Sequence, residues 1–136
     1  MPLHMPLSRI ARPLGLLLLF VPVLALAGPS AEQLAAGQAA FATCTRCHRV
    51  GPEARSGYGP QLNGIVGRRA GTLPDFNYSA AMKRSGIVWD ARSLAAFIRN
   101  PDQVVPGNRM RFASWGYDDR KIADLVAYLA SFPAER

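Results

Sequence analysis

The run Cys44-Thr45-Arg46-Cys47-His48 constrains this chain more than any other part of its sequence. Cysteines three positions apart on a helical turn share a face, so both sulfurs can reach one edge of a flat macrocycle. His48 follows Cys44 by four positions and lies on the same face, where a ring nitrogen can bind a metal at the centre of that macrocycle. This pattern is the attachment signal of a c-type haem. It predicts thioether bonds from Cys44 and Cys47 and an axial His48 ligand to the iron.

The same side chains allow two other interpretations. Two cysteines in an exported chain could form a disulfide, including a redox-active one of the thioredoxin type. That fold needs a strand leading into the motif, whereas the residues before Cys44 have a helical pattern. Zinc is also disfavoured, because after residue 27 only Cys44, Cys47 and His48 are available as Cys or His ligands, one fewer than a closed structural site uses. A haem is therefore the favoured interpretation.

Residues 1–27 have the features of a secretory signal peptide. Arg9 and Arg12 give a basic start, Leu14 to Ala27 is almost wholly apolar, and Ala25-Leu26-Ala27 is a small-x-small cleavage signal. We expect cleavage after Ala27 and a periplasmic mature chain that begins at Gly28. An uncleaved membrane anchor is the alternative, although this apolar run is shorter than the roughly 20 residues that a membrane span needs.

The remaining segment, 28–136, has the length of one domain. Removing Arg9 and Arg12 from the 16 basic residues leaves 14, against 9 acidic ones, so its net charge is +5. The charge is dispersed, whereas a nucleic-acid-binding protein would usually show a basic stripe with interleaved aromatic residues. We therefore expect no nucleic-acid partner. A positive charge of this kind suits brief contact with an acidic protein.

Beyond the haem motif, the sequence predicts helices joined by loops. Ser30 can cap a first helix, with Gln33 completing a capping box. Gly37 in that helix costs about 1 kcal/mol relative to alanine, so it is either tolerated or marks the close approach of a second helix. Further helices are expected at residues 79–84, from Asp90 to a stop at Asn100-Pro101, and from Asp118-Asp119 onward. The glycine-rich residues 50–72 and the segment beginning at Val104 are expected to form loops.

The second axial position on the iron needs a different ligand. His48 is the only histidine after residue 27, which excludes a second histidine, and the methionines in that part are Met82 and Met110. Met82 falls in the expected short helix, where methionine is usually core filler. Met110 follows the turn sequence Pro106-Gly107-Asn108-Arg109, which could aim its thioether inward. Met110 is thus favoured over Met82, and an open or water-ligated iron remains the other alternative.

Beyond these motifs, the chain resembles class I cytochromes c along nearly all of residues 28–136. The resemblance implies an all-α fold, in which the N- and C-terminal helices cross and short helices and loops wrap around one covalent haem c. The matching stretches are Cys44-x-x-Cys47-His48, Gly59-Pro60-x-Leu62-x-Gly64, Gly67-Arg68, Gly71, Pro74-x-Phe76-x-Tyr78, Gly86-Ile87-Val88-Trp89, Asn100-Pro101, Val105-Pro106-Gly107-Asn108-Arg109-Met110-x-Phe112 and Asp124-Leu125-Val126-Ala127-Tyr128-Leu129.

The resemblance also implies roles for individual residues. Cys44 and Cys47 would attach the haem, His48 and Met110 would ligate the iron, and the Pro60 carbonyl would accept the second ring N–H of His48. Gly37 and Phe41 would meet Leu125 and Tyr128. Arg68, Tyr78 and Trp89 would help to satisfy the haem propionates. Asn108 replaces the usual threonine beside the propionates, and Met82 and Phe97 replace residues that are usually polar.

The function implied is that of a monohaem one-electron carrier, not an enzyme. It would be a soluble monomer that meets redox proteins through an exposed haem edge, and its partners would carry acidic docking surfaces, as on a membrane oxidoreductase, oxidase, reaction centre or dehydrogenase. The family's lysine ring is reduced to Lys83 and Lys121. A substitute ring could come from Arg46, Arg49, Arg109 and Arg111. The alternative is a haem peroxidase or gas-binding protein with a labile sixth ligand, although a peroxidase needs a distal acid–base residue and no second histidine follows residue 27.

Overall fold

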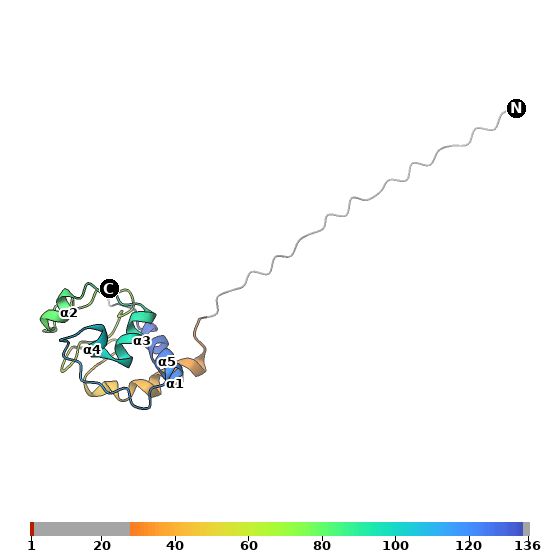
Figure 1. The fold of residues 1–136 in the computed structure, drawn as a ribbon. Helices are drawn as coiled ribbons and strands as arrows, with labels where there is room; N and C mark the ends of the chain where they lie inside the picture. The colour runs from red at the N-terminus through yellow and green to blue at the C-terminus, as the bar shows by residue number, and fades with distance from the viewer. Residues whose placement is uncertain (2–27, 135–136) are drawn as a thin grey trace.

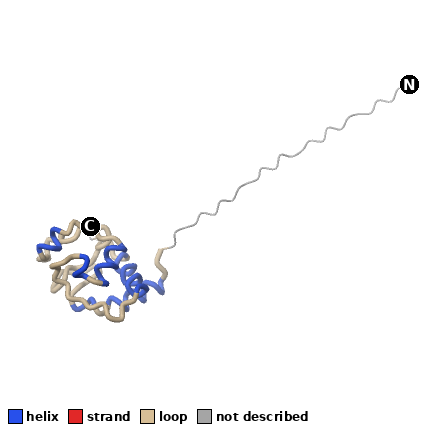
Figure 2. Tube along the Cα trace, viewed as in Figure 1, coloured by secondary structure: helices blue, strands red, loops and turns tan. Residues whose placement is uncertain are grey.

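The computed structural model of the chain describes Met1 and residues 28–134, so the predicted signal peptide lies outside the described residues apart from Met1. Residues 28–134 form an all-helical domain (Figures 1 and 2), which confirms the predicted fold class. Its only β-type pairing within those residues is an isolated bridge between Arg69 and Val88. The elements are α1 (Ala31–Phe41), the single 3₁₀ turn η1 (Cys44–Arg46), α2 (Ala80–Arg84), α3 (Ala91–Arg99), α4 (Pro101–Val104) and α5 (Asp119–Ala130).

Each α-helix in this part of the chain begins at a side chain that caps it. In every case an oxygen of the capping residue accepts the backbone N–H three positions later, which satisfies one of the free donors at a helix start. The capping residues are Ser30, Ser79, Asp90, Asn100 and Asp118. The predicted starts of α1, α2, α3 and α5 are therefore confirmed. Helix α4 is not predicted by the sequence, because Asn100-Pro101 indicates the end of a helix, whereas in the structure it also begins a new one.

Helices α1 and α5 cross at Gly37, and Figure 1 shows the two helices side by side. A Cβ atom at position 37 would lie 2.1 Å from the carbonyl oxygen of Asp124 and 2.6 Å from the Cβ of Tyr128. Beside this contact, the rings of Phe41 and Tyr128 lie 5.7 Å apart. The predicted close approach at Gly37 is confirmed, because only a residue without a side chain leaves room for the α5 backbone.

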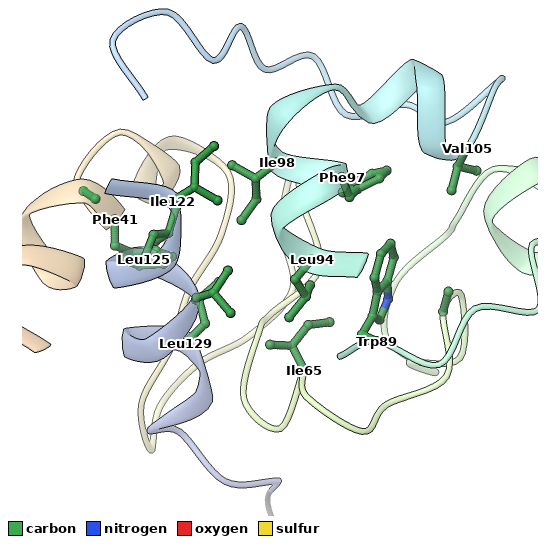
Figure 3. Packing of buried hydrophobic residues seen from close by; sticks show 13 residues of the cluster. Phe41, Ile65, Trp89, Leu94, Phe97, Ile98, Val105, Ile122, Leu125 and Leu129 are labelled. Atoms are coloured by element: carbon green, nitrogen blue, oxygen red, sulfur yellow. The ribbon is translucent and has the colours of Figure 1, made fainter. Parts of the chain in front are cut away.

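The core lies between α1, α3 and α5 and extends to Trp89. Figure 3 shows Leu94 and Ile98 of α3 turned toward α5, from which Ile122, Leu125 and Leu129 project. The rings of Trp89 and Phe97 lie 5.1 Å apart on the other side of α3. The apolar stripes predicted for these two helices are thus the buried faces.

Residues 50–72 contain no helix, as predicted, and are held by backbone hydrogen bonds. The N–H of Gly64 donates to the carbonyl of Phe132 at 2.8 Å, and the N–H of Gly67 donates to that of Trp89 at 2.7 Å. Gly64 has φ +63°, a left-handed conformation that costs other residues energy. These bonds fix the loop as a wall facing the helices. None of the helices within the described residues has the length and apolar content that a membrane span requires.

Candidate haem-binding site

A cavity of about 550 Å³ lies between the loop wall and the helices. This volume is within the range of roughly 300–1,000 Å³ found for ligand pockets in proteins. Much of the wall is apolar and is shared with the core, including Phe41, Leu94, Phe97 and Leu125. Eight of the nine predicted site residues line it: Cys44, Cys47, His48, Pro60, Arg68, Tyr78, Trp89 and Met110.

The imidazole of His48 is held from two sides. Its Nδ1 lies 2.8 Å from the carbonyl oxygen of Pro60, which can only accept, so Nδ1 carries the proton and Nε2 is left free as a neutral ligand atom. Gly59 closes the other side, because a Cβ there would lie 2.6 Å from the Cε1 of His48. Burial lowers the pKa of His48, although the Pro60 hydrogen bond opposes this shift. The ring is therefore oriented before any metal binds.

No disulfide joins Cys44 and Cys47. The backbone N–H groups of Cys47 and His48 donate to the carbonyl of Cys44 at 3.0 and 2.9 Å, so the motif folds as one tight turn. Burial raises the pKa of the Cys44 thiol to about 11, whereas Cys47 is exposed. The turn thus presents two sulfurs and one imidazole to the same cavity, the arrangement expected for attaching a macrocycle by one edge.

The cavity contains two thioether side chains. Met110 is half-buried on the loop that follows α4, and its N–H donates to the Oδ1 of Asn108 at 2.7 Å. Met82 of α2 also lines the cavity, as does Phe97 of α3. Met82 and Phe97, two of the three positions that depart from the family pattern, therefore face the cofactor space with apolar side chains.

Arg68 and Tyr78 provide polar groups to this largely apolar wall. The guanidinium of Arg68 donates to the carbonyls of Asn63 at 3.1 Å and Gln61 at 3.0 Å. Two of its five N–H donors are thereby used, and the others are available to an anionic group. Burial lowers the pKa of Arg68 and raises the pKa of Tyr78. With Trp89, which is almost fully buried, these residues fit a ligand that carries carboxylates.

Asn108 is the predicted site residue that the structure does not bring to the cavity. Its side chain is buried, with 1% of its surface exposed, and turns toward α4 instead. The resemblance implies a place beside the propionates, but the Asn108 amide instead donates to the carboxylate of Asp102 and to the carbonyl of Val105.

The mouth of the cavity is lined by three of the four arginines predicted to form a ring and by one tyrosine that was not predicted. Arg46, Arg109 and Arg111 of the predicted ring line the cavity, but Arg49 does not, because its guanidinium folds back onto the carbonyls of Thr45 and His48. Tyr58 also lines the mouth and is 94% exposed. Its position in Gly57-Tyr58-Gly59, outside any apolar pattern, is the signal that could have identified it.

These donors and walls fit an iron porphyrin. Two adjacent thiols, an imidazole with one free nitrogen, a thioether and an apolar cavity are the groups that a c-type haem uses. Within the described residues, no three or more His, Cys, Asp or Glu side chains gather in a way that would hold a bare metal ion.

Comparisons with known proteins agree with this interpretation. The family model for cytochrome c matches residues 34–133. A cytochrome c2 from Blastochloris viridis is 41% identical over 117 residues, covering 86% of this chain and 91% of that protein. A cytochrome c2 from Rhodomicrobium vannielii is 45% identical over 95 residues, covering 70% and 75%. The solved cytochrome c2 from Rhodospirillum centenum superposes with a TM-score of 0.70 at 33% identity, covering 74% of this chain and 98% of that one.

The chain belongs to the cytochrome c family. It is a class I monohaem electron carrier of the bacterial cytochrome c2 kind rather than an enzyme, and Cys44 and Cys47 fit the covalent attachment of one haem c.

Proposed function

We propose that this protein is a periplasmic electron shuttle whose iron is ligated by His48 and Met110. The observation that carries the proposal is that the free Nε2 side of His48 and the thioether of Met110 belong to one cavity with both motif cysteines. When bound, the haem supplies one-electron chemistry by cycling between ferrous and ferric iron. No substrate is transformed.

The residues of the cavity tune that chemistry. The soft sulfur of Met110 favours the reduced state and so raises the reduction potential. The Pro60 carbonyl increases the basicity of His48 and prevents rotation of its ring. The apolar side chains around them exclude water, and the surrounding dipoles are held by the fold, so little has to rearrange when the charge changes.

The ligand assignment can be tested with two matched variants, Met110→Ala and Met82→Ala. The ferric wild-type protein should show the weak visible band of sulfur-to-iron charge transfer. We expect Met110→Ala to lose this band and Met82→Ala to keep it. Loss of the band in Met82→Ala alone would assign the ligand to Met82, and its absence from the wild type would exclude ligation by either sulfur.

We further propose that redox partners dock at the cavity mouth through acidic surfaces. Arg46 and Arg109 line this mouth without an ion pair among the contacts of the described residues, and Arg111 has Asp102 at 3.6 Å. Exposed positive charges of this kind steer brief encounters and make their rate depend on ionic strength. Tyr58 adds an exposed aromatic surface of the type common in interface contacts.

The docking proposal is tested by electron-transfer rates with an acidic redox protein over a range of salt concentrations. Arg46→Gln should reduce the association rate at low salt and flatten its salt dependence. Arg120→Gln, at an exposed position of α5 that does not line the cavity, should leave both unchanged. Equal effects from both variants would mean that only net charge matters and would contradict a docking site at the mouth.

Export and maturation belong to the same proposal, with residues 1–27 as a cleaved signal peptide and residues 28–136 as the haem domain. Mass spectrometry of the exported protein should show a chain that starts at Gly28 and carries the mass of one haem. Acid–acetone treatment should leave the colour on the polypeptide, because thioether bonds are not broken by extraction. A haem lost in this treatment would contradict attachment through Cys44 and Cys47.

A further inference from the structure

Asn108 is one of the largest fully buried side chains in the described part of the chain, and it is polar. A buried amide is costly unless its groups are paired, so the partners of Asn108 show what it holds together. Its Nδ2 donates to the Oδ1 of Asp102 at 3.0 Å and to the carbonyl of Val105 at 2.9 Å. Its Oδ1 accepts the N–H of Met110 at 2.7 Å.

These bonds join a segment that does not line the cavity to one that does. Asp102 lies in α4 and Val105 directly follows this helix as its C-cap, whereas Met110 lies on the cavity wall. Both N–H donors and the oxygen of the amide are used, which leaves one orientation of the group without a loss of bonds. The amide therefore fixes the backbone of residue 110 relative to α4.

Arg111 closes the outside of this arrangement. Its Nη1 lies 3.6 Å from the Oδ1 of Asp102 and donates to the backbone carbonyl of Asn108 at 3.3 Å. Asp102 is mostly exposed, so this ion pair contributes little by itself. The ion pair with Arg111 holds in place the Asp102 carboxylate, which accepts a hydrogen bond from the Asn108 amide. The amide itself is shielded from water.

We propose that Asn108 is a positioning residue that clamps the Met110 loop to α4 and keeps the Met110 sulfur on the iron. This inference rests on the proposed ligation by Met110. Residues 105–118 lie between α4 and α5 and have no helix of their own, so the loop depends on side-chain contacts for its position. Without the Asn108 amide, buried donors and acceptors lack partners while the loop is docked, whereas water can pair with them once the loop is released. The substitution therefore favours release of the loop.

The clamp can be measured by competition with added imidazole at fixed pH. An outside ligand binds ferric iron only in molecules whose sulfur has left, so its apparent dissociation constant falls as the released fraction rises. We expect Asn108→Ala to bind imidazole about tenfold more tightly than the wild type. Asp102→Ala should give a smaller change in the same direction. Asp102→Asn, which keeps an acceptor oxygen, should stay close to the wild type.

Ser30→Ala provides the control for general destabilisation. It removes the cap of α1, far along the chain from the Met110 loop, and should lower the melting temperature by about 5 °C. If Ser30→Ala tightens imidazole binding as much as Asn108→Ala at an equal loss of melting temperature, the effect is global and the clamp is refuted. Unchanged affinity in both Asn108→Ala and Asp102→Ala refutes it as well. If Asn108→Ala does not fold, the comparison of Asp102→Ala with Asp102→Asn decides the question, because Asp102 is mostly exposed.

Failure of the underlying ligation gives a different result. A wild-type ferric protein without the sulfur-to-iron band would overturn Met110 ligation and the clamp together. A wild type that shows the band, with variants that do not change imidazole affinity, would overturn the clamp alone.

Discussion

Gly37→Ala tests how tightly α1 crosses α5. The added methyl group would lie 2.1 Å from the carbonyl oxygen of Asp124 and 2.6 Å from the Cβ of Tyr128. Neither atom belongs to the flexible end of a side chain, so the helices must move apart by about 1 Å to restore a normal contact. The crossing also forms one end of the haem cavity through Phe41 and Leu125, which makes the movement relevant to the site.

The free-energy change can be worked out from two opposing effects. Alanine is about 1 kcal/mol better than glycine in a helix interior. Overpacking a tight contact costs roughly 1–3 kcal/mol, and the rigid α5 backbone places this case at the upper end. The net loss is therefore about 2 kcal/mol. For a domain of this size, that corresponds to a fall of about 10 °C in melting temperature.

The assay is thermal unfolding of the haem-loaded protein, followed by circular dichroism. Gly57→Ala is the matched control, because a Cβ at position 57 would have no atom within 4 Å. It should change the melting temperature by no more than a few degrees. A Gly37→Ala protein as stable as the wild type would show that the helices do not meet as closely as the structure indicates, and would refute the argument.

Substitutions at three further positions test separate contacts. Gly59→Ala should push the imidazole of His48 away from its carbonyl partner and raise the reduction potential, since the ligand becomes less basic; a redox titration checks this. Asp90→Ala should lower the melting temperature at pH 7. Hydrogen bonds to Ser93 lower the pKa of Asp90, so this stabilisation is lost as the pH falls through that lowered pKa, where variant and wild type should converge; Asp90→Asn should retain the cap. Tyr117→Phe removes a 2.6 Å hydrogen bond to the Ala40 carbonyl and should lower the melting temperature by about 5 °C, measured by thermal unfolding.

Local sequence signals were sufficient for four of the five α-helices. Ser30, Ser79, Asp90 and Asp118 are good capping residues that precede helix-forming sequence, so each start is decided within a few residues. Helix α4 was missed because Asn100 has two roles. It ends α3 and its side chain caps the next turn, with Pro101 in the first helical position, where proline is well tolerated.

The site was predictable where residue type alone limits the chemistry. The spacing of Cys44, Cys47 and His48 is typical of haem attachment. Met82 and Met110 are the methionines after residue 27 and were therefore the candidate sulfur ligands. The side-chain directions of Arg49 and Asn108 were not predictable. Arg49 is close to the motif in sequence but donates to nearby carbonyls, and Asn108 donates to Asp102 of α4, a helix that the sequence signals do not predict.

The core and the cofactor site of this protein are largely the same set of side chains. Phe41, Trp89, Leu94, Phe97 and Leu125 belong to the buried cluster and also line the cavity. A covalently attached haem remains on the unfolded chain, but only in the folded chain does it cover the apolar surface that the helices alone leave facing the cavity. Folding and burial of the haem are therefore coupled through these residues. A change at the α1–α5 crossing acts on the redox site as well as on stability, because Phe41 and Leu125 take part in both.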